Sequence, residues 1–219
     1  MNSQKLVNYL KKGSEQEKWF AAEIIGAEKN HKYYEILVDS INDYAVDEVV
    51  VWCLGKMRKQ KSISFLINKL EKTKDTYVIH RTVEALTDIG DSAVPELIKF
   101  LSNSKNDEAR WRVAKTLGEK KYVKAFDILW KCVNDKNKFV RWRAIWAIKS
   151  LGGKIIPALI EKYDNSNEYL RWRILWVLGQ IGTESILKTI KEIEHKENSE
   201  FVKWQARQSI NQIRKIRDN

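Results

Sequence analysis

The sequence predicts an all-α fold, a right-handed α-solenoid (an α–α superhelix) of about seven stacked helix pairs. Three observations lead to this fold class. A ten-residue segment recurs along the chain at spacings of 29 to 32 residues. Seven of the nine glycines stand at two fixed places relative to that segment. No segment alternates polar and apolar residues over the length that a β-strand needs.

The recurring segment has the pattern of a helix with one buried face. Its clearest copies are 109–118, 140–149 and 170–179, and each has Arg-Trp-Arg after its first residue. Weaker copies begin at Glu17, Val46, Val78 and Val202. With the first residue as register 0, apolar or small residues return at registers 0, 4, 7, 8 and 11, within about 100° of one another on a helix. We therefore predict a first helix for each repeat near residues 17–27, 46–58, 78–90, 109–120, 140–152, 170–182 and 200–216.

A second apolar helix is predicted between successive copies. These second helices are expected near 33–41, 63–70, 93–101, 125–133, 155–163 and 186–193, and a capping helix near 4–11. One helix pair cannot bury its apolar face alone, so the pairs must stack. No linker interrupts the pattern, and we predict that residues 1–219 form a single array.

The recurring glycines are expected where each first helix ends and the chain turns. They fall at two registers of the repeat. Register 9 holds Gly26, Gly55, Gly118 and Gly179, and register 12 holds Gly90, Gly152 and Gly182.

Charge is distributed unevenly along the chain. Residues 1–109 hold 16 Lys and Arg against 17 Asp and Glu, whereas residues 110–219 hold 24 against 12. This asymmetry favours an acidic partner for the second half, either protein or nucleic acid. The two cysteines, Cys53 and Cys132, are isolated among apolar residues, so a reducing, cytoplasmic location is expected. No apolar run is long enough to cross a membrane, and no membrane association and no cofactor are expected.

Tryptophans gather on the face of the first helices that points away from the core. On a helical wheel the core registers centre near 30°, while registers 2 and 6 fall at about 200° and 240°. Eight of the nine tryptophans stand at registers 2 and 6, which we call the aromatic stripe. Exposed aromatic patches mark interaction sites. The candidate ligand-binding tryptophans are Trp111, Trp142, Trp146, Trp172, Trp176 and Trp204.

Cations flank the aromatic stripe at registers 1 and 3. Register 3 has no evident role in the repeat, so Arg112, Arg143 and Arg173 are candidate binding residues, together with Lys115 at register 6. The register 1 arginines are Arg110, Arg141 and Arg171. We interpret these mainly as structural ties between repeats.

The repeat resembles the short HEAT-like repeats of the phycobilisome-lyase type. The resemblance rests on Val140-Arg141, Ala144, Ile148, Leu151-Gly152 and Ile156-Pro157 with Leu159. It implies that the first helices line the concave side of the solenoid. It also implies a scaffold, a chromophore lyase or a protein-binding module, because this repeat serves all three.

The preferred hypothesis is a non-enzymatic binding or scaffold solenoid whose concave Trp/Arg stripe holds an extended acidic or phosphorylated protein segment. Armadillo solenoids bind in a similar way, since a row of tryptophans on their surface holds an extended peptide. Nucleic acid is the alternative, because aromatic platforms with flanking arginines bind single strands.

An enzyme is a minor alternative, either chromophore-lyase-like or metal-dependent. His80 and Glu84 share one helix face at i,i+4. Glu48 stands at the register of His80 in the preceding repeat, and Asp88 lies one helical turn after Glu84. A single histidine rarely makes a transition-metal site, so no metal ligand and no catalytic residue is predicted.

Overall fold

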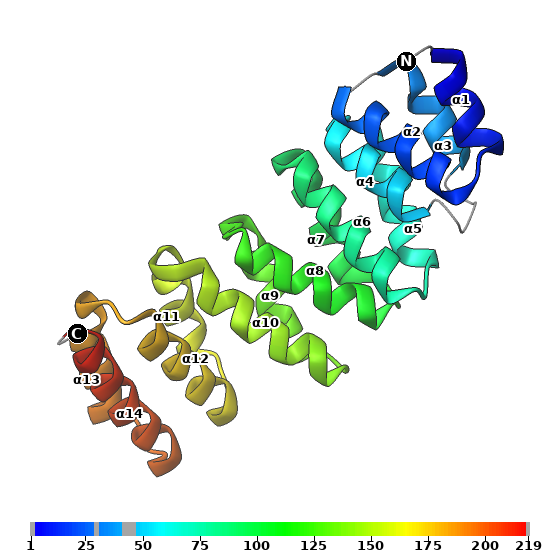
Figure 1. Ribbon diagram of the computed structural model, residues 1–219. Helices are drawn as coiled ribbons and strands as arrows, with labels where there is room; N and C mark the ends of the chain where they lie inside the picture. The colour runs from blue at the N-terminus through cyan, green and yellow to red at the C-terminus, as the bar shows by residue number, and fades with distance from the viewer. Residues whose placement is uncertain (1–2, 29–30, 41–46, 218–219) are drawn as a thin grey trace. The chain divides into compact units, whose positions relative to one another are not determined.

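In the computed structural model the described residues, 3–28, 31–40 and 47–217, form helices, turns and bends with no strand among them. The helices alternate along the chain between the two predicted types (Figure 1). The all-α solenoid class is therefore confirmed. The predicted helix ends at residues 41 and 46 lie outside the described residues.

Each predicted helix has a counterpart in the structure. The first helices of the repeats are α2 (Glu15–Glu28), α4 (Asp47–Met57), α6 (Thr76–Ile89), α8 (Asp107–Glu119), α10 (Lys138–Leu151), α12 (Glu168–Ile181) and α14 (Glu200–Arg217). The second helices are α1 (Ser3–Lys12), α3 (Tyr34–Ser40), α5 (Ser62–Lys72), α7 (Val94–Asn103), α9 (Phe126–Cys132), α11 (Ile156–Asp164) and α13 (Leu187–Lys196). From α3 onward, every second helix except α5 is preceded by a short 3₁₀ turn.

The chain divides into two compact units, Met1–Thr116 (unit 1) and Leu117–Asn219 (unit 2). Helix α8 crosses the boundary, so that Trp111 and Arg112 belong to unit 1 and Gly118 belongs to unit 2. Within unit 2, the apolar registers of α10, α12 and α14 are buried, as Ala144, Ile174 and Ala206 illustrate. The register pattern therefore identified the core face correctly.

Helix ends follow local chemistry. The N-cap side chains of Asp75 and Asn137 each accept two backbone N–H bonds from the first turn of α6 and α10. At the other end, Gly90, Gly152 and Gly182 have φ angles of 94°, 75° and 72°. These values lie in the left-handed region that glycine tolerates. The register 12 glycines thus end the first helices, as predicted.

The prediction for the register 9 glycines was wrong. They lie inside the helices and face register 7 of the next first helix. A Cβ placed on Gly55 would lie 2.7 Å from the Cα atom of Ala85, and one on Gly118 would lie 2.3 Å from the Cα atom of Ala147. Glycine stands there because two helix backbones approach closely, and no side chain fits between them.

Candidate binding face

The spacing between the first helices of unit 2 depends on register 9. A Cβ on Gly179 of α12 would lie 2.8 Å from the Cα atom of Ser209 on α14, so these two helices are in close backbone contact. The same register of α10 is Lys149, and its Nζ atom lies 4.6 Å from the centre of the Trp146 ring. Across the α10–α12 contact, Trp146 meets Trp176 edge-on with ring centres 5.6 Å apart. Two rings therefore meet at the α10–α12 contact, whereas the helix backbones themselves approach closely at the α12–α14 contact.

Unit 2 contains five of the six candidate tryptophans, and their exposure differs. Trp142 and Trp204 are 50% and 52% exposed, and Trp146 is 39% exposed. Trp172 and Trp176 are half-buried. The Trp142 ring contacts the Trp146 ring at 5.9 Å, so Trp142, Trp146 and Trp176 form one continuous cluster of edge-on rings.

Trp172 differs from the other register 2 tryptophans of unit 2 because it is covered by α14. Its ring stacks on Phe201 with ring centres 5.9 Å apart and an angle of 11° between the planes. The Trp172 Nε1 atom is buried and has no hydrogen-bond partner. This stacking follows from the close approach that Gly179 permits between α12 and α14.

A column of aromatic residues at register −1, which was not among the predicted binding residues, lies beside the aromatic stripe. In unit 2 this column is Phe139, Tyr169 and Phe201, which are 56%, 53% and 50% exposed. Register −1 falls at about 260° on the wheel, beside register 6, so extending the register by one residue would have found it. We call the eight rings of α10, α12 and α14 at registers −1, 2 and 6 the aromatic face of unit 2. They are Phe139, Trp142, Trp146, Tyr169, Trp172, Trp176, Phe201 and Trp204.

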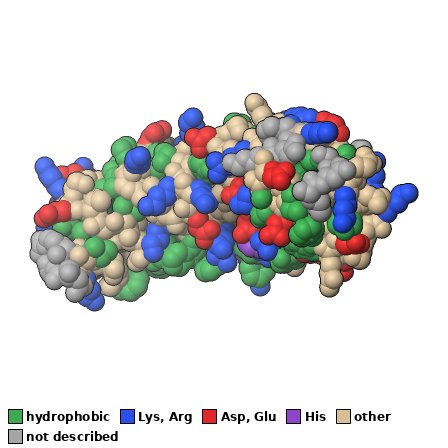
Figure 2. Space-filling model, turned by 45° about the horizontal axis from the view of Figure 1, so that its top comes forward, with side chains coloured by type: hydrophobic (Ala, Val, Ile, Leu, Met, Phe, Trp, Pro, Cys, Tyr) green, Lys and Arg blue, Asp and Glu red, His purple; other side chains and the backbone are tan. Residues whose placement is uncertain are grey.

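Cations lie against the rings of this face. The Arg143 guanidinium lies 4.6 Å from the Trp142 ring centre, and the Arg173 guanidinium lies 4.0 Å from the Tyr169 ring centre. Arg173 also donates to the Val133 carbonyl at 3.1 Å and to the Tyr169 hydroxyl. Arg173 therefore has a structural role in addition to its position on the face. Figure 2 shows hydrophobic side chains in green reaching the surface beside blue Lys and Arg side chains.

Three candidate residues lie on α8 in unit 1. Trp111, Arg112 and Lys115 are all half-buried. Trp111 Nε1 donates to Glu108 Oε2 at 2.8 Å, and Arg112 Nε donates to Glu108 Oε1 at 3.0 Å. A carboxylate of the chain itself therefore engages this Trp-Arg pair.

The register 1 arginines hold the repeats together. Arg171 makes hydrogen bonds of 2.9 and 3.1 Å to the two oxygens of Glu197, and it donates to the Ser166 carbonyl at 2.9 Å. Arg141 donates to the backbone carbonyls of Asp135 and Lys136, at 2.7 and 3.0 Å, in the loop before α10.

The Glu197 carboxylate lies between α13 and α14, and Arg171 and neighbouring residues cover most of its side chain. Burial by itself raises the pKa of Glu197. Hydrogen bonds from the Tyr163 hydroxyl, the Ser199 amide and Arg171 outweigh burial and lower this pKa to about 2. Burial, together with donation to Glu197, raises the pKa of Tyr163. Near neutral pH, Glu197 therefore stays ionised and Tyr163 stays protonated. We call the ion pair of Arg171 with Glu197 the Arg171–Glu197 lock.

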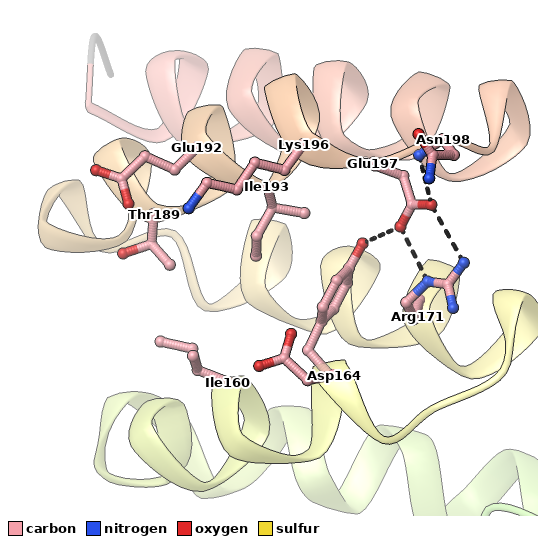
Figure 3. Close-up of a pocket in the computed structure, with 10 residues that line it drawn as sticks. Ile160, Asp164, Arg171, Thr189, Glu192, Ile193, Lys196, Glu197 and Asn198 are labelled. Atoms are coloured by element: carbon pink, nitrogen blue, oxygen red, sulfur yellow. Dashed lines mark hydrogen bonds and ion pairs between the residues drawn. The ribbon is translucent and has the colours of Figure 1, made fainter.

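Cavities lie among the second helices of both units. One, of about 440 Å³, lies beside the Arg171–Glu197 pair and is lined by residues of α11 and α13 (Figure 3). The other, of about 380 Å³, lies between α5 and α7 in unit 1. Both have mixed charge, with Asp164 and Lys196 around the first and Glu96 and Lys99 around the second. Neither cavity includes a ring of the aromatic stripe.

The residues considered for enzyme chemistry are engaged in ordinary contacts. His80 Nε2 lies 3.5 Å from Glu84 Oε1, and Arg81 pairs with the same carboxylate at 3.0 Å. No group of three His, Cys, Asp or Glu suited to a metal ion occurs among the described residues. Burial raises the pKa of the Cys53 thiol to about 12, so Cys53 is a poor nucleophile. In the part of the chain that is described, no helix has the length and hydropathy needed to cross a bilayer.

Residues 63–149 and 133–211 match the family model for HEAT repeats. In the complex of CpcE and CpcF of phycocyanin lyase from Nostoc sp., one chain is 18% identical over 97% of this chain and 95% of its own, with a TM-score of 0.50. Human deoxyhypusine hydroxylase is 20% identical over 96% of this chain and 83% of its own, with a TM-score of 0.46. A search of curated proteins finds no match. At these identities the structural likeness shows a shared fold alone.

Proposed function

Because this chain belongs to the HEAT-repeat family, we propose that it is a non-enzymatic binding or scaffold solenoid. The aromatic face of unit 2 holds an extended anionic partner, an acidic or phosphorylated protein segment. The observation that carries the proposal is the set of exposed rings on three neighbouring helices with cations stacked on them.

The exposure of these rings is difficult to explain by folding alone. Trp142 and Trp204 are half-exposed at a position where the repeat requires no aromatic residue, since Glu48 and His80 occupy register 2 elsewhere. Burying such a ring in a complex would recover about 25 cal/mol per Å² of apolar surface. Rings that stay exposed in the unbound chain therefore favour a role in binding.

The sign of the charge favours an anionic ligand. Residues 110–219 hold twice as many Lys and Arg as Asp and Glu. Helix α10 has four cationic residues and no acidic one. An acidic segment laid across these helices would gain ion pairs along its length and would associate faster at low salt.

The arrangement of the rings favours protein over nucleic acid. Single-strand binding needs ring faces on which bases can stack. Here Arg143 covers one face of Trp142, Lys149 lies over Trp146, and the rings meet each other edge-on. Cations beside the rings suit the carboxylates and phosphates of an acidic protein segment.

Tryptophan fluorescence of the full chain tests this proposal. The chain is titrated with poly-glutamate, a phosphorylated acidic peptide and a single-stranded oligonucleotide, each at low and moderate salt. We expect the acidic polymers to quench the emission, with weaker binding at higher salt. The double variant Trp142→Ala/Trp204→Ala should bind several-fold more weakly. Phe20→Ala is the matched control, because Phe20 is 49% exposed but lies in unit 1.

Two results would contradict the proposal. Quenching by the oligonucleotide alone would replace it with the nucleic-acid alternative. No response to any of the three ligands would refute a face that binds anions.

A further inference from the structure

The exposed rings at register −1 form a row with one member on each first helix of unit 2 from α10 onward, and we call it the register −1 row. Phe139, Tyr169 and Phe201 each stand one residue before the apolar register 0 of α10, α12 and α14. Their exposed fractions, 56%, 53% and 50%, are nearly equal. Because the three rings share one register, the row repeats with the helices that carry it. A partner that uses the row must therefore present the same side once per helix.

The spacing of these helices follows from their contacts. A Cβ on Gly179 would lie 2.8 Å from the Cα atom of Ser209. With a Cα–Cβ bond of about 1.5 Å and Cα atoms about 2.3 Å from each axis, the axes of α12 and α14 approach to about 9 Å or less. Helices α10 and α12 meet through Trp146 and Trp176, and packed helices lie about 8–10 Å apart. The register −1 row therefore has a period of about 9 Å.

One regular backbone conformation matches this period. A polyproline II helix has three residues per turn and rises about 3.1 Å per residue, so it presents the same side about every 9.3 Å. A β-strand presents the same side every two residues, or about 6.7 Å. Proline-rich segments in the polyproline II conformation dock on aromatic-lined surfaces and lose little conformational entropy when they bind. The spacing and the aromatic character of the row therefore both favour a proline-rich segment.

Cations beside two of the rings favour a segment that is also acidic. The Lys138 Nζ atom lies 5.2 Å from the Phe139 ring centre, and the Arg173 guanidinium lies 4.0 Å from the Tyr169 ring centre. Arg173 donates to the Val133 carbonyl and to the Tyr169 hydroxyl. Both acceptors are neutral, so these bonds leave the positive charge of Arg173 in place. Attraction between this charge and an acidic segment acts through distance and does not require an unbonded cation.

Resting on the proposed function, we infer that the aromatic face of unit 2 binds a proline-rich acidic segment of the partner protein in the polyproline II conformation. The segment crosses α10, α12 and α14 and advances by three residues from one helix to the next. A proline of each three packs on the ring of the register −1 row, and an acidic residue of each three lies beside the cations of α10 and α12. The partner therefore carries proline and Asp or Glu at every third position.

Three synthetic peptides of equal charge test the inference on the full chain. The first repeats Pro-Pro-Glu four times. The second has the same composition with its glutamates gathered in one block, and the third repeats Gly-Gly-Glu four times. Tryptophan fluorescence gives the dissociation constant of each peptide at low salt. We expect the first peptide to bind about tenfold more tightly than either of the others, because it alone combines a preformed conformation with the required spacing.

Phe139→Ala tests whether the register −1 row makes the proline contact. This variant should bind the Pro-Pro-Glu peptide several-fold more weakly and the Gly-Gly-Glu peptide almost as the native chain does, because glycine has no ring to pack on Phe139. Tyr77→Ala is the matched control, since Tyr77 has the same register on α6 of unit 1 and is 46% exposed. It should leave both affinities unchanged.

The outcomes separate this inference from the proposed function. Equal affinities of the Pro-Pro-Glu peptide and either of the others, or binding of poly-glutamate but of none of the three peptides, would overturn the inference and leave the proposed function in place. An equal loss of affinity for the Pro-Pro-Glu and Gly-Gly-Glu peptides in Phe139→Ala would also overturn it. A native chain that binds neither the peptides nor poly-glutamate would overturn both.

Discussion

Replacing Gly179 with alanine tests whether register 9 sets the contact between α12 and α14. The new Cβ would lie 2.7 Å from Ser209 Cβ and 2.8 Å from Ser209 Cα, about 1 Å closer than an ordinary carbon–carbon contact. Because one of these atoms is backbone, the helices must move apart. Overpacking of this kind costs about 1–3 kcal/mol.

The opposing effect is helix propensity, which favours alanine over glycine by about 1 kcal/mol. Subtracting this gain from the cost of overpacking leaves about 0–2 kcal/mol, so we expect Gly179→Ala to destabilise unit 2 by about 1 kcal/mol. Urea denaturation followed by circular dichroism measures this change. The control is Gly153→Ala, since the nearest atoms to its new Cβ would be 3.8 Å away, and its stability should stay within about 0.5 kcal/mol of the native value. Equal stability of the two variants would refute the reasoning.

The remaining predictions concern single side chains of unit 2. Trp142→Ala should change the free energy of unfolding by about 0.5 kcal/mol because the ring is half-exposed, whereas Trp172→Ala should cost about 1–2 kcal/mol because its stack on Phe201 is lost. Similar costs in thermal melts would contradict the difference in burial. The lowered pKa of Glu197 predicts about 3 kcal/mol of stability above pH 4.5 that is lost as the pH falls toward 2. Glu197→Gln should therefore lose less stability between pH 5 and 3 in urea titrations. If the free energy of unfolding of Glu197→Gln fell with pH as steeply as that of the native chain, the Arg171–Glu197 lock would be excluded as the source of the pH dependence.

The sequence was sufficient to predict the helices and the core, because both depend on a period that repeats seven times. Register 12 was also predicted, since Gly152 ends a helix through its own backbone conformation. Register 9 was not, because a glycine needed for close approach looks the same in sequence as one needed for a turn. Gly118 is explained only by the position of Ala147 on the neighbouring helix.

The candidate site could be predicted only in part. Trp142 and Trp172 occupy the same register, yet one is half-exposed and the other is covered by Phe201. Their difference depends on the spacing between helices, which a helical wheel does not contain. The register −1 rings, such as Phe139, could have been found on the wheel and were overlooked. The single continuous array, the cytoplasmic location and the acidic partner stay predictions.

The alternation between Gly179 and Lys149 has a mechanical consequence for unit 2. Where two backbones touch, as at α12 and α14, the contact can deform only by straining the main chain, so the pair is stiff. Where side chains meet, as Trp146 and Trp176 do between α10 and α12, rotation about single bonds absorbs the strain. We therefore expect unit 2 to bend most easily at the α10–α12 contact, whose rings belong to the proposed binding face, so that its stiffness and its proposed binding surface depend on the same residues.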